Sequence, residues 1–284
     1  MIRNRPLTAI LCWLALSASA VLFAQDSTAP NGAAPNNAAQ WTPPPFFAFQ
    51  NGVRLGTPDD EARVLKELGY DGISQVFLTG DPLAKKVAAF DKAGLKVLSV
   101  YLNVDDKPIA EDAIRPLANR NAIVELTVRK MTPQTVDAVR ETAATAEKLN
   151  VGVAIYPHHG FAVATMPQAM ELITTVDHPN LGVMFNLCHF LKNESADDLE
   201  KVLKQAGDKL FAVSTSGANV DGDNWGELIQ TLDQGDFPQR RLLRALKEMQ
   251  FAGPVGLQCY GIRGDSRGNL QRSMSAWKEI VAER

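Results

Sequence analysis

Apolar segments of strand length alternate with capped helical segments along most of this chain. The first helix shows the pattern clearly: Thr57 is a cap, Pro58 occupies the first turn, and Gly69 ends the helix after apolar residues at helical spacing. A short apolar strand at 73–78 follows, and the same order then recurs. Strands that alternate with helices are typical of a parallel sheet.

This alternation extends from residue 46 to the end of the chain. The expected strands span 46–53, 73–78, 96–102, 122–128, 152–156, 182–185, 210–214 and 254–259. The expected helices span 57–69, 81–94, 108–118, 132–150, 165–176, 195–207, 240–249 and 270–281. A long excursion at 216–236 holds Trp225. Eight strand–helix units in this length predict one α/β domain folded as a (β/α)8 TIM barrel.

Residues 1–24 have the features of a secretory signal peptide. Arg3 and Arg5 form a basic start, an apolar run extends over 7–23, and Ala24 is a small residue at a cleavage position. A transmembrane anchor is the alternative, but the run carries two serines and is barely long enough to span a bilayer. We therefore expect export to the periplasm or the extracellular space, with no stable membrane anchor after cleavage.

Residues 25–45 are rich in Ala, Pro, Asn and Thr and have no apolar period, so we expect a disordered tether before a barrel at 46–284. The chain has 29 Lys and Arg against 32 Asp and Glu, without a basic cluster, which disfavours nucleic-acid binding. Beyond the signal, Cys188 and Cys259 form no disulfide framework. We expect free, buried thiols, although an oxidising compartment would permit a disulfide.

Two apolar runs end in polar clusters that contain histidine. One is at 151–160 and ends with His158 and His159, and the other is at 181–190 and contains His189. The carboxyl ends of barrel strands build the active site of this architecture, so His158 and His189 are candidates for one pocket. His159 and His178 are expected to be surface or loop residues.

Four short motifs follow one another along the barrel: GYDGI at 69–73, AIYPH at 154–158, GVMFNLCH at 182–189 and GLQ at 256–258. With the predicted architecture, this set resembles the motifs of xylose-isomerase-like TIM barrels. That superfamily contains sugar isomerases, sugar epimerases and nucleases of the endonuclease IV type. The resemblance covers the whole predicted barrel and implies a small-molecule carbohydrate as ligand.

The chain departs from the metal site that this resemblance implies. The family binds a divalent metal through Glu, Asp, His and Glu at four strand ends. The corresponding positions hold Tyr156, Asn186, Ser214 and Gln258. Because a hard divalent cation needs anionic oxygen ligands, we expect no metal cofactor here, in a pocket whose polar lining remains.

The resemblance and the residue types suggest roles for the pocket side chains. His158 and His189 are candidate acid–base groups, since imidazole titrates near neutral pH. Glu125 interrupts a buried strand, so it is either a catalytic carboxyl with a raised pKa or part of an ion pair with a cation such as Arg129. Asn186 and Gln258 are candidates for hydrogen bonds to sugar hydroxyls.

Three further residues have two interpretations each. Tyr156 and Trp225 are placed to stack on a sugar ring, but aromatic residues more often belong to a core. Arg263 lies in the glycine-rich segment 261–268, which would either bind an anion before the last helix or form a solvated turn. For the whole chain, one hypothesis is an exported enzyme that isomerises, epimerises or eliminates next to a sugar carbonyl or hydroxyl. The alternative is a non-catalytic barrel that binds a carbohydrate or a partner protein.

Overall fold

The computed structural model describes residues 41–282. The predicted signal peptide and the tether residues 25–40 lie outside the described residues. Trp41–Pro45 packs against the barrel: the Trp41 indole donates to the Phe251 carbonyl (2.9 Å), and the Val255 amide donates to the Pro45 carbonyl (2.9 Å). The barrel domain therefore includes these five residues, before the expected start at Phe46. None of the helices in residues 41–282 combines the length and the hydropathy needed to cross a bilayer.

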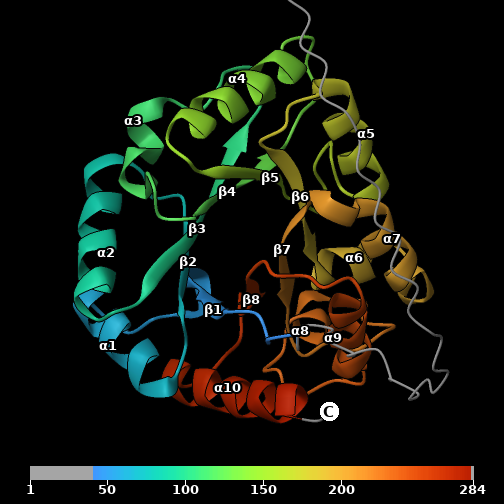
Figure 1. Cartoon of the computed structure of the whole chain (residues 1–284). Helices are drawn as coiled ribbons and strands as arrows, with labels where there is room; N and C mark the ends of the chain where they lie inside the picture. Colours follow the sequence, from blue (N-terminus) through green and yellow to red (C-terminus); the bar gives the residue numbers. More distant parts are fainter. Residues whose placement is uncertain (1–40, 283–284) are drawn as a thin grey trace, which may run out of the picture. The chain divides into compact units, whose positions relative to one another are not determined.

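The eight strands form one closed, parallel barrel in sequence order, which confirms the predicted fold class (Figure 1). Their bounds are β1 Phe46–Phe49, β2 Gly72–Val76, β3 Lys96–Val104, β4 Ile123–Val128, β5 Gly152–Ile155, β6 Leu181–Asn186, β7 Leu210–Thr215 and β8 Val255–Leu257. The pairing of β8 with β1 closes the sheet, with Phe47 beside Gly256. A closed parallel barrel brings all eight carboxyl ends to one face.

Helices surround this barrel on the outside (Figure 1). They are α1 Pro58–Leu68, α2 Gly80–Lys92, α3 Glu111–Ile114, α4 Thr135–Lys148, α5 Met166–Val176, α6 Leu187–Asn193, α7 Leu199–Ala206, α8 Trp225–Leu228, α9 Gln239–Glu248 and α10 Ser266–Ala282. The caps are those that the sequence indicates: Thr57 and Asp60 form a capping box on α1, and Gly69 ends it at a φ of 92°.

Two short helices, α6 and α8, were not expected. The first begins directly at the end of β6, where the Asn186 side chain accepts the backbone N–H of His189. The second lies within the 216–236 excursion and is capped by Asn224. Both are one to two turns long, which is too short for a helical period to show in the sequence. Both lie at the carboxyl face and so contribute to the site.

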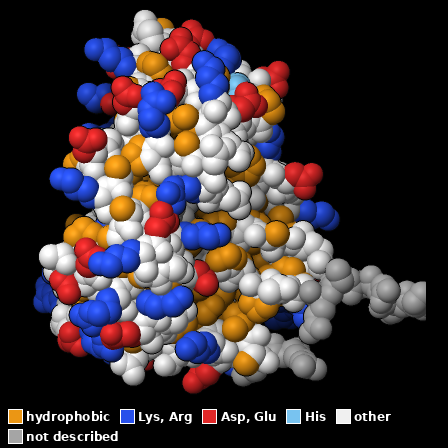
Figure 2. Space-filling view, turned by 60° about the vertical axis from the view of Figure 1, so that its left-hand side comes forward, with side chains coloured by type: hydrophobic (Ala, Val, Ile, Leu, Met, Phe, Trp, Pro, Cys, Tyr) orange, Lys and Arg blue, Asp and Glu red, His pale blue; other side chains and the backbone are white. Residues whose placement is uncertain are grey.

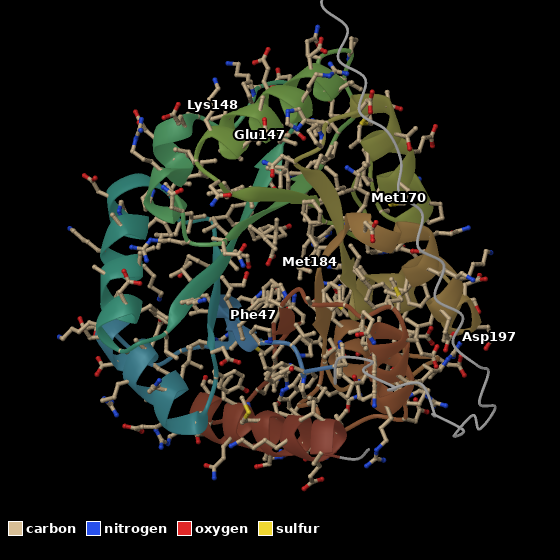
Figure 3. All side chains as sticks on the ribbon, in the orientation of Figure 1. Phe47, Glu147, Lys148, Met170, Met184 and Asp197 are labelled. Atoms are coloured by element: carbon tan, nitrogen blue, oxygen red, sulfur yellow. The ribbon has the colours of Figure 1, made fainter. Side chains whose placement is uncertain are left out.

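The residues inside the barrel become more polar toward the carboxyl ends of the strands. Phe47 of β1 and Met184 of β6 point into its centre (Figure 3) and are fully buried. Nearer the carboxyl ends of the strands, buried polar residues join the apolar ones, and they include Ser99, Glu125 and Asn186. Outside the strands, the Phe46 ring stacks on Trp277 of α10 at 4.3 Å. On the surface, charges of both signs are interspersed over the face that Figure 2 shows.

Candidate active site

A cavity of about 520 Å³ lies at the carboxyl ends of the strands. The lining side chains are Phe49, Asn51, Val76, Phe77, Tyr101, Asn103, Arg129, Tyr156, His158, Phe161, His189, Trp225, Ile229, Gln258 and Tyr260. Aromatic rings dominate this wall, and Phe77 and Tyr260 are more than half exposed. Such a concave, largely apolar space with a few convergent polar groups is what a small-molecule site requires.

His158 and His189 lie in contact with each other on the wall of this cavity. Their ring centroids are 4.1 Å apart. His158 follows β5, whereas His189 lies in the first turn of α6, which Asn186 holds at the end of β6. Two segments separated by about thirty positions in the sequence therefore meet at one point, as expected from their places at neighbouring strand ends.

The backbone of His159 gives the two imidazoles opposite tautomers. The His158 Nδ1 lies 2.8 Å from the His159 carbonyl oxygen, which only accepts, so this nitrogen carries the proton and Nε2 has a free lone pair. The His189 Nδ1 accepts the His159 backbone N–H at 3.2 Å, so its proton is on Nε2. One ring thus offers a basic nitrogen and the other an N–H donor.

Burial keeps both rings neutral at physiological pH. Desolvation lowers the pKa of His158, although its hydrogen bond to the His159 backbone opposes that shift. Desolvation lowers the pKa of His189 further, and the neighbouring His158 adds to the effect. A neutral pair is the state in which one imidazole can take a proton while the other donates a hydrogen bond.

Aromatic side chains fix the orientation of the pair. Phe161 stacks on the His158 ring, with centroids 4.1 Å apart and planes 17° from parallel. Trp225 of α8 meets the His189 ring edge-on at 5.2 Å. The His159 side chain lies outside the pair, where its Nδ1 is 2.6 Å from the Asn193 Oδ1. Trp225 is therefore a wall residue, and α8 places it there.

A neutral hydrogen-bond cluster lies at the floor of the cavity, where Tyr156 and Gln258 line it and Asn186 lies behind them. The hydroxyl of Tyr156 accepts from the Asn186 amide nitrogen and from the Gln258 amide nitrogen, the latter at 3.3 Å. Burial raises the pKa of Tyr156 well above its usual value, so the phenol stays protonated. Among the described residues the Tyr156 O–H has no acceptor of its own, which leaves its proton available to a ligand.

The two amide oxygens are turned away from this centre. The Gln258 Oε1 accepts the backbone N–H groups of Cys259 (3.0 Å) and Tyr260 (3.1 Å). The Asn186 Oδ1 accepts from the Cys188 thiol at 3.0 Å. Both cysteines are buried and free, as expected. The amides consequently present N–H groups, not oxygen lone pairs, to the Tyr156 hydroxyl.

This arrangement does not fit the divalent metal that the family resemblance implies. A hard cation needs oxygen lone pairs, yet the groups that converge here are two amide N–H donors and a phenol that is already bonded to them. Ser214, at the position of the family's histidine ligand, is fully buried, and its hydroxyl has no partner among the described residues. Within residues 41–282, no group of three or more His, Cys, Asp or Glu side chains is placed to hold a metal ion.

Glu125 lies below the cavity and does not line it. Its side chain is fully buried on β4, where one carboxyl oxygen accepts from the Ser99 and Ser74 hydroxyls, the latter at 3.1 Å, and the other oxygen has no partner. Desolvation raises its pKa to about 7, which these two hydrogen bonds oppose. Of the two interpretations from the sequence, an ion pair with Arg129 is absent among the described contacts.

Two of the remaining candidate residues lie away from the cavity. Arg263 is exposed in the loop after β8 and does not line the cavity. His178 lies in the loop before β6, where its Nδ1 accepts the Asn180 N–H at 3.1 Å.

Sequence reasoning gave no site role to Tyr101, Asn103, Phe161 or Tyr260, and it considered Arg129 only as a partner for Glu125. Asn103 ends the inward row of β3 and Arg129 directly follows β4, so the strand-end rule that selected His158 could have selected them.

A family model described as "Xylose isomerase-like TIM barrel" matches residues 128–280. The chain belongs to this family. A "Probable ketose 3-epimerase" from Synechocystis sp. (strain ATCC 27184 / PCC 6803 / Kazusa) is 24% identical over 153 residues, which are 52% of this chain and 50% of that protein. The match thus spans about half the length of that curated relative.

Solved structures of sugar epimerases share the fold of this family member. The 3-keto-D-glucoside 4-epimerase from E. coli has a TM-score of 0.63 at 17% identity, over 84% of this chain and 99% of that one. The D-psicose 3-epimerase from Clostridium cellulolyticum H10, solved with D-tagatose, has a TM-score of 0.62 at 15% identity, over 84% and 98%. At these identities the likeness establishes the architecture, and the chemistry has to be argued from the site.

Proposed function

We propose that this protein is an exported carbohydrate-active enzyme of the sugar isomerase and epimerase type, which moves a proton next to a carbonyl or hydroxyl of a small sugar without a metal. The observation that carries the proposal is the His158–His189 pair. Its rings are 4.1 Å apart, neutral, and of opposite tautomers. Export rests on the signal-like features of residues 1–24.

The two rings have separate roles in the proposed proton transfer: His158 is the base, and His189 is the hydrogen-bond donor. The His158 Nε2 takes the proton from the carbon next to the carbonyl, and the electron pair of that C–H bond forms the C=C bond of an enolate. The negative charge moves to the former carbonyl oxygen, where the His189 Nε2–H donates a hydrogen bond. Donors fixed in a water-poor site stabilise such a charge far better than mobile water does.

Tyr156 supplies the second donor in this proposal. Its oxygen already accepts from Asn186 and Gln258, so its own proton is polarised and directed to the ligand. Return of the proton to the former carbonyl carbon, while the neighbouring hydroxyl passes its own proton to the enolate oxygen, gives isomerisation. Protonation of the original carbon on its opposite face, by a donor on that side or after the enolate has turned over, gives epimerisation. Loss of a neighbouring hydroxyl with that proton gives elimination. The same enolate serves all three outcomes.

The alternative is a barrel that binds a carbohydrate or a partner protein without turnover. One observation favours it: the described lining residues include no Asp or Glu, and the carboxyl of Glu125 lies below the floor. The two functions differ in whether a carbon-bound hydrogen of the ligand exchanges with solvent.

Solvent exchange is therefore the deciding test. Chelator-treated protein is incubated with a panel of ketoses and keto-sugars in D2O, and deuterium incorporation at carbon is followed by NMR. The proposal expects exchange that His158→Gln and His189→Gln each reduce by about two orders of magnitude, as is typical of general acid–base groups. His178→Gln, a histidine of the opposite face, is the matched control and should leave exchange unchanged. Binding without exchange in the unmodified protein would establish the alternative.

A further inference from the structure

The cavity holds one formally charged side chain, and that charge is positive. Arg129 follows β4 directly and is among the lining residues, whereas the described lining includes no Asp or Glu. Both histidines are neutral there, since burial lowers the pKa of each. The cavity wall therefore has a net positive charge, which favours a ligand that carries a negative one.

The backbone of Arg129 is held on both sides. Its N–H donates to the Asp105 carboxylate at 3.2 Å, and its carbonyl accepts from Ala162 at 3.2 Å. The Asp105 carboxylate also accepts the Lys130 N–H at 3.1 Å, so it caps this loop. Among the described residues, no carboxylate oxygen lies within ion-pair distance of the Arg129 guanidinium. The backbone of Arg129 is therefore held in place, and no described carboxylate neutralises its side-chain charge.

The guanidinium lies over the Phe161 ring, 5.6 Å from its centroid. The Phe161 ring also stacks on His158, which in turn meets His189. A single row of planar groups therefore leads from the cation to the acid–base pair. A ligand anchored at one end of this row has its neighbouring atoms close to the other end.

We propose that the ligand of this cavity is a sugar acid, whose carboxylate Arg129 binds while the adjoining hydroxyl or carbonyl carbon lies at His158 and His189. A guanidinium matches a carboxylate with two parallel N–H donors, which fixes both position and orientation. The proposal builds on the function proposed above and adds the class of substrate.

Pairs of sugars that differ only in one oxidised carbon provide the test. D-fructose is compared with 2-keto-D-gluconate and with D-fructuronate, which carry the carboxylate at opposite ends of the same carbon chain. Binding is measured by calorimetry on the full barrel at low ionic strength. We expect one of the two acids to bind about tenfold more tightly than D-fructose, and the preference to decrease as salt is added.

Three variants of two arginines identify the charge that is responsible for this preference. Arg129→Gln should remove the preference, and Arg129→Lys should keep part of it because the charge remains but the fork is lost. Arg263→Gln removes the same charge from an exposed residue outside the cavity and should leave the preference intact. Equal binding of D-fructose and both acids would overturn the proposal, and so would loss of the preference in Arg263→Gln but not in Arg129→Gln. Tight acid binding without solvent exchange would contradict the proposed catalysis alone, and exchange of D-fructose without an acid preference would contradict the substrate class alone.

Discussion

Replacing Glu125 with Gln should make the stability of this protein less dependent on pH. The carboxyl is fully buried, and its pKa rises from 4.5 to about 7. Each unit of pKa difference between the folded and unfolded chain corresponds to about 1.36 kcal/mol, so the full effect is about 3 kcal/mol. Glutamine cannot ionise, and it retains an oxygen and a donor for the Ser74 and Ser99 hydroxyls.

The sign follows from the protonation states. The folded state favours the protonated acid, so the stabilisation from Glu125 is complete below pH 4.5 and is lost as the pH rises through about 7. Between about pH 5 and pH 8 the unmodified protein should lose roughly 2.5 kcal/mol relative to Glu125→Gln. For a chain of this size that corresponds to about 5–10 °C in Tm. The buried histidines act in the opposite direction, since their lowered pKa values reduce stability as the pH falls.

Comparison with the variant cancels the histidine contribution. Urea unfolding of both proteins over this pH range gives the difference directly, and the variant should be the more stable of the two at pH 8. Glu248→Gln, which replaces an exposed carboxyl at the end of α9, controls for the loss of one carboxylate and should leave the pH dependence of stability as it is in the unmodified protein. A pH-independent difference between Glu125→Gln and the unmodified protein would refute the reasoning, because it would show that Glu125 has the same ionisation behaviour in the folded and unfolded chain.

Four other predictions concern the floor of the cavity, the metal content, a redesigned metal site and the start of the domain. Tyr156→Phe should lower the free energy of unfolding by about 1–3 kcal/mol in a denaturant titration, since two buried amide N–H groups lose their acceptor, and an unchanged value would contradict the described floor. Elemental analysis of the dialysed protein should find no stoichiometric zinc, manganese or magnesium, whereas one retained equivalent would contradict this. The combined variant should gain metal affinity in the same assay: Tyr156→Glu, Asn186→Asp, Ser214→His and Gln258→Glu. Deleting residues 25–40 should leave Tm almost unchanged, while Trp41→Ala should lower it, because the indole bonds to the Phe251 carbonyl.

The barrel could be predicted because its signals are local and repeated. Caps such as Thr57 and stops such as Gly69 depend on residues only three or four positions away, so the sequence displays them directly. The start of the domain was placed too late, because Trp41 is held by Phe251, more than two hundred residues further along the chain. A contact of that kind has no local signature.

The candidate site was predictable in part for the same reason. His158, His189 and Gln258 were found because each occupies a strand end. The tautomers of the two histidines could not be predicted, since they depend on the contacts that the His158 and His189 rings make with the backbone of His159. Likewise, the orientation of the Gln258 amide is set by two backbone N–H groups of its own loop, which composition does not reveal.

The backbone unit of His159 has a consequence for how this site can change. Its carbonyl and its N–H together assign the base and the donor, and its side chain points to Asn193 instead. Exchanging that side chain for almost any other therefore preserves the polarity of the pair. Proline is the exception, because it has no N–H to offer His189. The backbone geometry thus determines which ring is the base and which is the donor, and few single substitutions would change that geometry.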